Sequence, residues 1–533
     1  MKVISGITEE ICSVEGVKLL NVDPGRDTNR TVVTFVGDPE SVVEAAFRAV
    51  KKASELIDMR KHKGAHPRMG ATDVCPFIPV SGITMDEAVG YARQFAERTG
   101  KELNIPVYCY EYAAFEEKRK NLANCRAGEY EGLKKKLTDP EWKPDYGPAL
   151  FNEKAGATAV GARDFLVAFN VNLNTTSTRR ANAIAFDVRE KGRNITNEKG
   201  EKVNVPGSLK NVKAIGWYLK EYGIAQISMN LTNISETPVH LVFDEVCRKA
   251  EARGIRVTGS ELVGLIPLKA ILEAGRYFLD KQQRSSGVPD RELIKIAVKS
   301  MGLDDLRPFE PEKKIIEYAM DGEDSDKLVN LSLRSFMETV SSELPVPGGG
   351  SVSAYMASLG VGLGTMVANL SSHKRGWDHR WKEFSDWAEK GRQIQNSLLE
   401  LVDEDTIAYR RIIEAGRLPR NTEKEQVFRR KMISEAVKYA IEVPFVIMET
   451  AMEGYDVIKE MVKEGNPASV TDAGVGALAL MASVKGAFLN IKINAAGLDE
   501  KSSVENILQK AAEIERISEK KTGEILDLIE SLL

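Results

Sequence analysis

The pattern of hydrophobic and polar positions divides the chain into a first part of alternating strand-like and helix-like segments and a second part that is helical. In the first part, β-branched and aromatic runs bounded by Gly, Pro or polar residues predict strands at 31–37, 74–80, 106–110, 165–172, 214–219, 225–231 and 256–258, the last ending at Gly259. Amphipathic spacing predicts helices after Asp38-Pro39, over 84–98 and over 238–252, and another that ends near Arg189. This alternation predicts two α/β modules, that is, two mixed-sheet α+β subdomains.

Beyond residue 320 the pattern predicts helices alone. They cover about 328–341, 351–371, 379–415, 423–454, 467–494 and 501–532, and Gly and Pro residues separate them. Long helices with short breaks predict an all-α antiparallel bundle. The segment 467–494 is rich in Gly and Ala, so we expect it at the centre of the bundle or at a subunit interface. The predicted domains are therefore 1–164, 165–320 and 329–533, with an acidic linker at 321–328.

Composition narrows the class of protein. The 533 residues include 74 Lys and Arg and 78 Asp and Glu, so a strongly basic nucleic-acid surface is not expected. No run of about 18 apolar residues predicts a membrane span, and the first residues do not resemble a signal peptide. The five cysteines show no CxxC spacing, which argues against a disulfide framework or a zinc site and favours a cytoplasmic location.

Two histidines, His62 and His66, lie four residues apart in a segment that also contains Gly64 and Pro67. These residues favour a loop over a helix, and since no third ligand is evident we expect no metal. A histidine on a loop that leads into a strand could act as a general base, because its ordinary pKa is near neutrality. The alternative is a polar turn without chemistry.

Two further segments each allow two interpretations. Asp23 follows an apolar run and could orient a histidine or bind a cation, but Asp23-Pro24-Gly25 is typical of a turn, which we favour. Gly348, Gly349, Gly350 and Ser351 precede a predicted helix, whose free N–H groups suit an anion or a polar ring edge. No Lys-Ser/Thr follows these glycines, so they are not a Walker loop, and they could also be a flexible hinge.

Asp405 interrupts an apolar helical stripe formed by Leu398, Val402, Tyr409 and Ile412. A carboxylate at such a position needs either a partner or a chemical task. Burial would raise its pKa and make it a general acid or base at neutral pH. A buried salt bridge is the alternative interpretation.

Several segments of the first part resemble glutamate formiminotransferases. The most specific is His-Pro-Arg-Met-Gly-Ala-Thr-Asp-Val-Cys-Pro-Phe-Ile-Pro-Val at 66–80, and 29–32, 126–131, 156–163, 215–219 and 262–269 support it. Residues 347–351 and 402–405 resemble formiminotetrahydrofolate cyclodeaminases. The order of the two parts is that of the bifunctional formimidoyltransferase-cyclodeaminases.

The resemblance implies roles for individual residues. His66 matches the catalytic histidine of the transferases, and Asp405 matches the proposed catalytic acid of the cyclodeaminases. The folate contacts fall on Gly147, Pro148, Phe151 and Gly156, and on Asp187, Val188 and Arg189, with Gly348 to Ser351 as the folate loop of the second site. Asp23 could stabilise the charged histidine, and Arg68 and Arg163 are candidates for binding the glutamate carboxylates.

The resemblance also implies a function. Such an enzyme transfers the formimino group of N-formimino-L-glutamate to tetrahydrofolate, with or without a polyglutamate tail, and then forms 5,10-methenyl-tetrahydrofolate with release of ammonia. This places the chain in histidine degradation, as a homo-oligomer that is a dimer or a ring of dimers, with no nucleic-acid or membrane partner. Two alternatives concern the helical part: a cyclohydrolase-like or inactive domain, or an oligomerisation module that binds folate polyglutamate.

Overall fold

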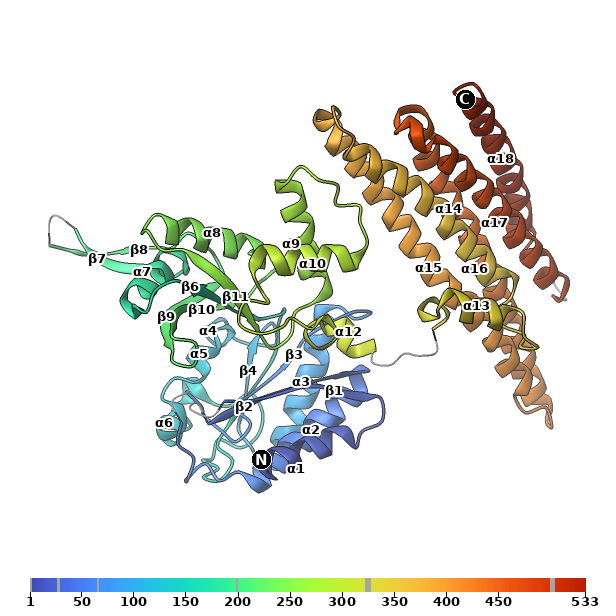
Figure 1. Ribbon diagram of the computed structural model, residues 1–533. Helices are drawn as coiled ribbons and strands as arrows, with labels where there is room; N and C mark the ends of the chain where they lie inside the picture. Colours follow the sequence, from blue (N-terminus) through green and yellow to red (C-terminus); the bar gives the residue numbers. More distant parts are fainter. Residues whose placement is uncertain (1, 26–28, 65–66, 198–199, 322–326, 499–503) are drawn as a thin grey trace. The chain divides into compact units, whose positions relative to one another are not determined.

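The computed structural model describes residues 2–25, 29–64, 67–197, 200–321, 327–498 and 504–533 (Figure 1). The chain forms two compact units. One comprises Met1–Ile271 and Met301–Gly322, and the other comprises Leu272–Ser300 and Glu323–Leu533. The first unit combines sheets with helices and the second is helical, which confirms the predicted fold class.

The first subdomain contains a parallel three-stranded sheet in the order β3 (Val74–Phe77), β5 (Thr158–Ala162) and β4 (Val107–Glu111). The helices α2 (Pro39–Leu56) and α3 (Met85–Leu103) share one hydrophobic core with these strands. A separate antiparallel hairpin joins β1 (Val17–Gly25) to β2 (Arg30–Gly37), and α1 (Lys2–Cys12) packs against α2. Three short helices, α4 (Glu117–Lys120), α5 (Leu122–Cys125) and α6 (Glu129–Lys136), follow β4.

The second subdomain contains an antiparallel four-stranded sheet in the order β11 (Val257–Val263), β6 (Val167–Leu173), β10 (Ile224–Leu231) and β9 (Val212–Leu219). The helices α7 (Thr178–Val188) and α8 (Val239–Glu251) contact this sheet, and β7 (Arg193–Thr196) pairs with β8 (Lys202–Val205) as a hairpin. The central strand β6 is buried on both faces. Phe169 and Val171 alternate along it with Asn170 and Asn172, so one of its faces is polar.

Two details of the sequence interpretation are wrong. Asp23, Pro24 and Gly25 do not form a turn, because they continue β1 and pair with Val32, Thr31 and Arg30 of β2. Gly259 does not end a strand. It lies inside β11 at a register shift, where a Cβ atom would meet the side chain of Asp305, so the glycine permits a close approach instead of a chain reversal.

The second unit is a bundle whose main helices are α14 (Gly349–Ser372), α15 (Trp381–Arg417), α16 (Glu423–Glu464), α17 (Val470–Ala496) and α18 (Glu505–Glu530). The shorter α13 (Leu333–Val340) precedes them. In the described ranges 327–498 and 504–533 there is no strand. The helix α16 extends ten residues beyond the predicted end at 454, and Pro444 lies inside it.

The second unit also contains most of α9 (Leu268–Lys281) and α10 (Asp290–Met301). The loop between these helices is buried at Ser285, Ser286 and Gly287. The Ser285 hydroxyl donates to the Asn369 side chain at 2.6 Å, and the Asn369 amide donates to the Gly287 carbonyl at 2.9 Å. These bonds attach the loop to α14.

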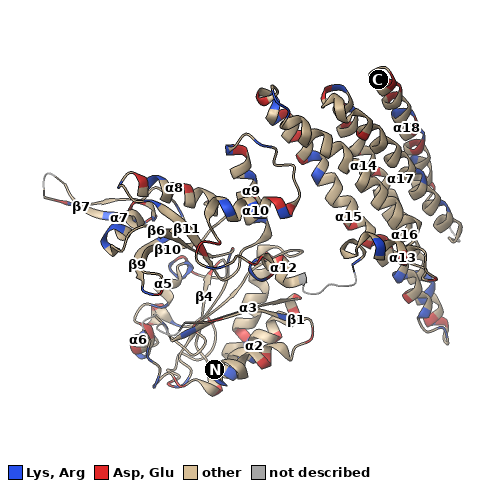
Figure 2. Ribbon diagram, viewed as in Figure 1, with Lys and Arg blue, Asp and Glu red and all other residues tan. Residues whose placement is uncertain are grey.

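Small residues let α17 approach its neighbours closely, as its composition predicts. It packs against α14, α16 and α18, so it is central in this unit. At Gly360 of α14 a Cβ atom would lie 2.7 Å from the carbonyl oxygen of Gly476 in α17. In Figure 2 the charged residues of this unit lie mainly along α15, α16 and α18, whereas α14 carries none.

Two segments of the bundle are long and apolar enough to cross a membrane. They are Gly349–Ser372 and Pro467–Ala496, and 61% and 50% of their most apolar windows are buried inside the unit. Both segments contribute to the same hydrophobic core, which accounts for their apolar composition.

Replacement of a helical glycine by alanine should have opposite effects on the stability of the bundle at two positions, because only one of them lies at the close contact of α14 with α17. Gly360→Ala forces the two backbones apart and should destabilise the bundle by about 1–3 kcal/mol. Gly523→Ala in α18 meets no atom within 4 Å, so it should stabilise by about 0.4–1 kcal/mol. Calorimetric midpoints of the full-length variants measure both effects, and a stabilising Gly360→Ala would refute the close contact.

Candidate active sites

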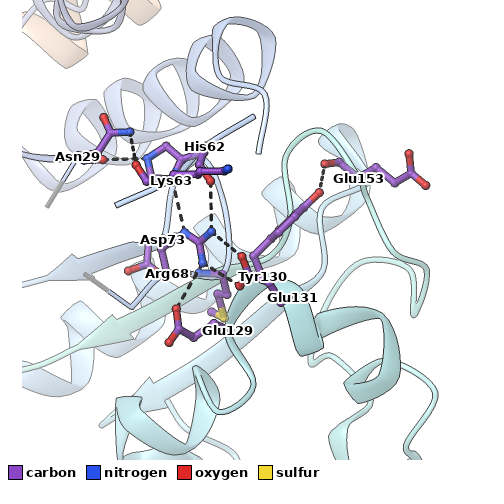
Figure 3. Close-up of polar contacts among 10 residues, drawn as sticks. Asn29, His62, Lys63, Arg68, Asp73, Glu129, Tyr130, Glu131 and Glu153 are labelled. Carbon is purple, nitrogen blue, oxygen red and sulfur yellow. Dashed lines mark hydrogen bonds and ion pairs between the residues drawn. The ribbon is translucent and has the colours of Figure 1, made fainter. Parts of the chain in front are cut away.

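The loop that follows α2 is attached to the start of β2 through His62 (Figure 3). The His62 Nε2 atom lies 2.8 Å from the backbone oxygen of Asn29, and the Asn29 side-chain amide donates to the Lys63 carbonyl at 2.7 Å. The Arg68 Nε donates to His62 Nδ1 at 3.4 Å. One ring nitrogen of His62 thus faces the Asn29 carbonyl and the other faces the Arg68 guanidinium, so the ring links the start of β2 to Arg68.

Arg68 connects this loop to α6. Its guanidinium forms a two-bond contact with the Glu131 carboxylate at 2.7 and 2.8 Å, and it donates to Glu129 at 3.3 Å. The Tyr130 backbone N–H also donates to the Arg68 carbonyl at 2.9 Å. The hydrogen bond from Arg68 lowers the pKa of Glu131.

Asp73 forms a second charged cluster behind the loop. Its carboxylate accepts from the Met69 backbone N–H at 3.0 Å and pairs with Arg126 at 2.6 Å and with Arg30 at 3.7 Å. The side chains of Asp73 and Arg126 are only 9% and 14% exposed. Burial and the charge of Arg126 lower the pKa of Arg30, although Asp73 opposes them.

An open pocket of about 630 Å³ lies between the loop and α6. Its walls are formed by Lys63, Gly64, Arg68, Gly128, Glu129 and Glu131. The predicted catalytic residue His66 lies outside the described residues. Its described neighbours in the chain are Gly64, which lines the pocket, and Pro67.

The other residues predicted for the transferase chemistry lie apart from this pocket wall. Asp23 is exposed in β1, opposite Val32. Arg163 directly follows β5, and its guanidinium donates to the Asp164 carbonyl at 2.8 Å.

The predicted folate residues of the first subdomain lie in the segment between α6 and β5. Gly147 and Gly156 have φ values of 79° and 71° and lie against the backbone of Ile105 and Met69, so glycine is needed at both positions. The Phe151 ring lies 5.4 Å from that of Tyr130. Pro148 is half-buried and precedes Leu150, whose side chain is 72% exposed. The segment therefore exposes apolar surface at Leu150, between two glycines that lie directly against neighbouring backbone.

The second predicted folate segment ends α7. The Asp187 carboxylate pairs with Arg193 and Arg253, and Val188 is fully buried. The Arg189 guanidinium donates to the carbonyl of Gly192 at 2.9 Å. All three side chains therefore stabilise the fold around the β7–β8 hairpin in this structure.

The predicted cyclodeaminase residues come together in the helical unit. Both the backbone N–H and the hydroxyl of Ser351 donate to Asp405 Oδ2, at 2.8 and 3.1 Å. Ser351 is fully buried in the first turn of α14, and Asp405 projects from α15. The free N–H groups and the partial positive charge of a helix N-terminus stabilise such a carboxylate. Ser351 therefore contacts the catalytic candidate itself.

At two of the three positions before Ser351, a side chain larger than that of glycine would collide with neighbouring atoms. A Cβ atom on Gly350 would overlap the Asp405 carboxylate, and one on Gly349 would lie 3.0 Å from the side-chain nitrogen of Asn490 in α17. Gly348 is the N-cap residue of α14 and has an extended backbone. The glycines thus let α14 begin directly over Asp405, and a hinge is not needed to explain them.

Burial and hydrogen bonding act on Asp405 in opposite directions. Desolvation raises the pKa of Asp405, and the two hydrogen bonds from Ser351 lower it, with a net upward shift. No salt bridge to Asp405 is present within the described residues, so the half-buried carboxyl is stabilised by hydrogen bonds and not by a cation. Such a group can hold a proton nearer to neutral pH than an exposed aspartate.

Metal ligands are not grouped in the described part of the chain. No set of three or more His, Cys, Asp or Glu side chains in those ranges could hold a metal ion.

The whole chain is similar to known folate enzymes. Residues 1–163 match the N-terminal subdomain of the formiminotransferase domain, 168–321 match the formiminotransferase domain, and 332–513 match formiminotransferase-cyclodeaminase. The formimidoyltransferase-cyclodeaminase of Gallus gallus is 44% identical over 506 residues, which cover 95% of this chain and 92% of that protein. The chain therefore belongs to the formimidoyltransferase-cyclodeaminase family.

Each half also has relatives of its own. The glutamate formimidoyltransferase of Streptococcus pyogenes is 45% identical over 277 residues, 52% of this chain and 88% of that protein. The methenyltetrahydrofolate cyclohydrolase of Methylorubrum extorquens is 31% identical over 180 residues, 34% of this chain and 86% of that protein.

Several residues of both sites were not predicted. Asn29, Glu129 and Glu131 bind the loop and Arg68, and Asn490 lies beside Gly349. Their partners are tens of residues away in the sequence, so no local pattern could indicate them. For Glu129 and Glu131 the resemblance of 126–131 to the transferases was the available signal.

The contact between α14 and α15 predicts that Gly350→Ala impairs ring closure. The added methyl group displaces the Asp405 carboxylate, and a misplacement of about 1 Å can cost roughly 10²-fold in rate. Ammonia release from 5-formimino-tetrahydrofolate measures the loss. Glutamate release by the same protein is the control and should be retained, and normal ammonia release would contradict the contact.

The opposing influences on Asp405 predict the direction of a pH effect. As a general acid, Asp405 must be protonated, so ring closure slows as the pH rises through its pKa. Ser351→Ala removes a hydrogen bond that favours the carboxylate, so the falling limb should move to higher pH. The pH profile of ring closure tests this, and a shift to lower pH would be inconsistent with the geometry.

Proposed function

We propose that this chain transfers the formimino group of N-formimino-L-glutamate to N5 of tetrahydrofolate and then forms 5,10-methenyl-tetrahydrofolate, with release of ammonia. Membership of the bifunctional family supports the pair of activities. The observation that carries the second activity is the Asp405 carboxyl held by Ser351 at the start of α14, because it supplies an acid in a half-buried site.

The first step exchanges one carbon–nitrogen bond for another. N5 of tetrahydrofolate attacks the formimino carbon, and the bond from that carbon to the glutamate nitrogen breaks. N5 loses a proton and the glutamate nitrogen gains one. We propose His66 as the group that accepts the proton, because a histidine can both take and return it near neutral pH.

The second step closes a ring. N10 attacks the same carbon and loses its proton, and the bond from that carbon to the former imino nitrogen breaks. This nitrogen gains two protons, one in place of the proton lost by N10 and one from an acid, and leaves as ammonia. Ammonia leaves readily only after this nitrogen is protonated, so the step needs an acid at the reacting carbon. Asp405 fits this role because burial favours its protonated form, while Ser351 stabilises the carboxylate that remains after the proton is transferred.

A second candidate activity concerns the helical unit alone. Its similarity to a methenyltetrahydrofolate cyclohydrolase makes hydrolysis of the methenyl product a specific alternative. In that reaction water attacks the one-carbon unit and no ammonia appears. Ammonia release therefore distinguishes the two activities.

We also propose that the protein is a homo-oligomer, either a dimer or a ring of dimers. Four apolar side chains of α17, at 475, 478, 489 and 493, are between 42% and 70% exposed and recur at near-heptad spacing on the central helix of the unit. A second copy of the chain could cover this stripe. The same contact would serve the alternative function of the helical unit, an oligomerisation module that binds folate polyglutamate.

The proposal also covers the cellular location of the protein, its pathway and its co-substrate. Five free cysteines, three of which are not fully buried, fit a cytoplasmic protein. The use of N-formimino-L-glutamate would place it in histidine degradation. We propose that tetrahydrofolate is a co-substrate that can carry a polyglutamate tail, and that no metal takes part.

A coupled assay on the purified full-length protein tests the proposal. N-Formimino-L-glutamate and tetrahydrofolate are added, and glutamate, ammonia and methenyl-tetrahydrofolate are followed together. All three should appear in equal amounts. Glutamate alone would leave the helical unit without ring-closing activity, and no product at all would refute the proposed function.

Two single variants should separate the two activities. His66→Ala removes the proton acceptor and should slow glutamate release by about 10²–10⁴-fold, while ring closure of supplied 5-formimino-tetrahydrofolate continues. Asp405→Asn should do the reverse and accumulate the formimino intermediate. Each variant is the control for the other, and full transfer activity in His66→Ala or unchanged ammonia release in Asp405→Asn would contradict the assignment.

A further inference from the structure

All five N–H donors of the Arg68 guanidinium face acceptors. The Nε donor and one terminal donor face His62, at 3.4 and 3.3 Å, and the others face Glu131 and Glu129. The side chain is only 12% exposed. An incoming anion can therefore bind this guanidinium only by replacing one of the present partners.

The acidic partners are the ones that can be replaced. The Glu131 side chain is 65% exposed and that of Glu129 is 44% exposed, whereas His62 is held from its other side by Asn29. The incoming carboxylate makes the same bonds to the guanidinium that Glu131 gives up, and the released Glu131 carboxylate is solvated, so the exchange costs at most about fivefold in affinity. Both acids line the open pocket beside the loop.

A different arginine pair nearby does not allow such an exchange. Arg126 and Asp73 are 14% and 9% exposed and lie 2.6 Å apart, and Asp73 also accepts from the Met69 backbone. Removing one partner of a buried pair leaves an uncompensated charge. The two arginines are about equally exposed, so the difference lies in their acidic partners: Glu131 is 65% exposed and can leave Arg68, whereas Asp73 is 9% exposed and stays with Arg126.

The carboxylate of Glu131, which binds the Arg68 guanidinium, is also present in the proposed substrate. N-Formimino-L-glutamate carries two carboxylates, and its side-chain carboxylate is the same group as that of Glu131. The planar fork of an arginine binds either one with two parallel bonds. The same pocket wall contains Lys63, a second positive charge for the second carboxylate.

We propose that Arg68 binds a carboxylate of N-formimino-L-glutamate and that Glu131 occupies this position in the free enzyme until the substrate displaces it. The proposal rests on the proposed transferase function. Glu131 is then a specificity-determining residue, because it competes with the substrate carboxylate for the guanidinium of Arg68.

The test is the KM for N-formimino-L-glutamate in the full-length Glu131→Gln protein. Glutamine keeps the size of the side chain but binds the guanidinium less strongly, so this KM should fall by about two- to fivefold. The KM for tetrahydrofolate should keep its wild-type value. The inhibition constant of the product L-glutamate should fall together with the KM, because the product carries the same carboxylates.

Two further variants make the result specific. Glu102→Gln removes the same charge from a 55% exposed carboxylate that pairs with Arg98 in α3 and does not line the pocket, so the KM for N-formimino-L-glutamate should not change. Arg68→Lys keeps the charge but loses the fork, so this KM should rise by about tenfold or more.

A raised KM in Glu131→Gln would overturn the proposal, since it would make Glu131 a support for Arg68. An unchanged KM in both Glu131→Gln and Arg68→Lys would overturn it as well. These outcomes are distinct from failure of the proposed function, in which the wild-type protein releases no glutamate.

Discussion

The contact between the first turn of α14 and the Asp405 carboxylate is the constraint on which the helical half depends. A carboxyl group can lie there because Gly350 has no side chain and because Ser351 donates two hydrogen bonds to one of its oxygens. The rest of the unit keeps this contact in place. Gly360 and Gly476 bring α14 against α17, and the apolar core surrounds the stripe of α15 that carries Asp405. The helix α14 therefore both packs against α17 and contacts the candidate catalytic residue.

The transferase half depends on charges rather than on one buried group. The loop beside the pocket is held on one side by the contact of His62 with Asn29 and on the other by the ion pairs of Arg68 with α6. Asp73, Arg126 and Arg30 form a more buried cluster behind it. The buried ions support the loop, and the more exposed ones face the pocket and can change partners. This division between fixed and exchangeable ion pairs suits a site that must accept and release a dicarboxylate.

Much of the fold could be predicted from the sequence, because periodicity reports burial. The helices of the second unit and strands such as β2, β4 and β10 follow their hydrophobic patterns. The strand β5 (Thr158–Ala162) was missed, because its small residues, buried on both sides, give no alternation. Asp23-Pro24-Gly25 has turn composition, but pairing with β2 keeps it extended.

From the sequence pattern, site residues could be predicted only where a polar residue stands in an otherwise apolar pattern. Asp405 interrupts an apolar stripe, and the structure places its carboxylate against the N–H and hydroxyl of Ser351. Glu131 and Asn490 show no such conflict in the sequence, because a single acid or amide in a helix is ordinary. Their significance arises from partners that are distant in the chain, and only the tertiary structure brings these together.

The protonation of Asp405 is the most direct test of this account, since ring closure depends on an acid at that position. Infrared difference spectroscopy of the full-length protein, with Asp405→Asn to assign the band, follows its carboxyl stretch as the pH is changed. The account predicts a protonated carboxyl that titrates above the ordinary range of aspartate, as burial requires. Titration within that ordinary range would contradict it.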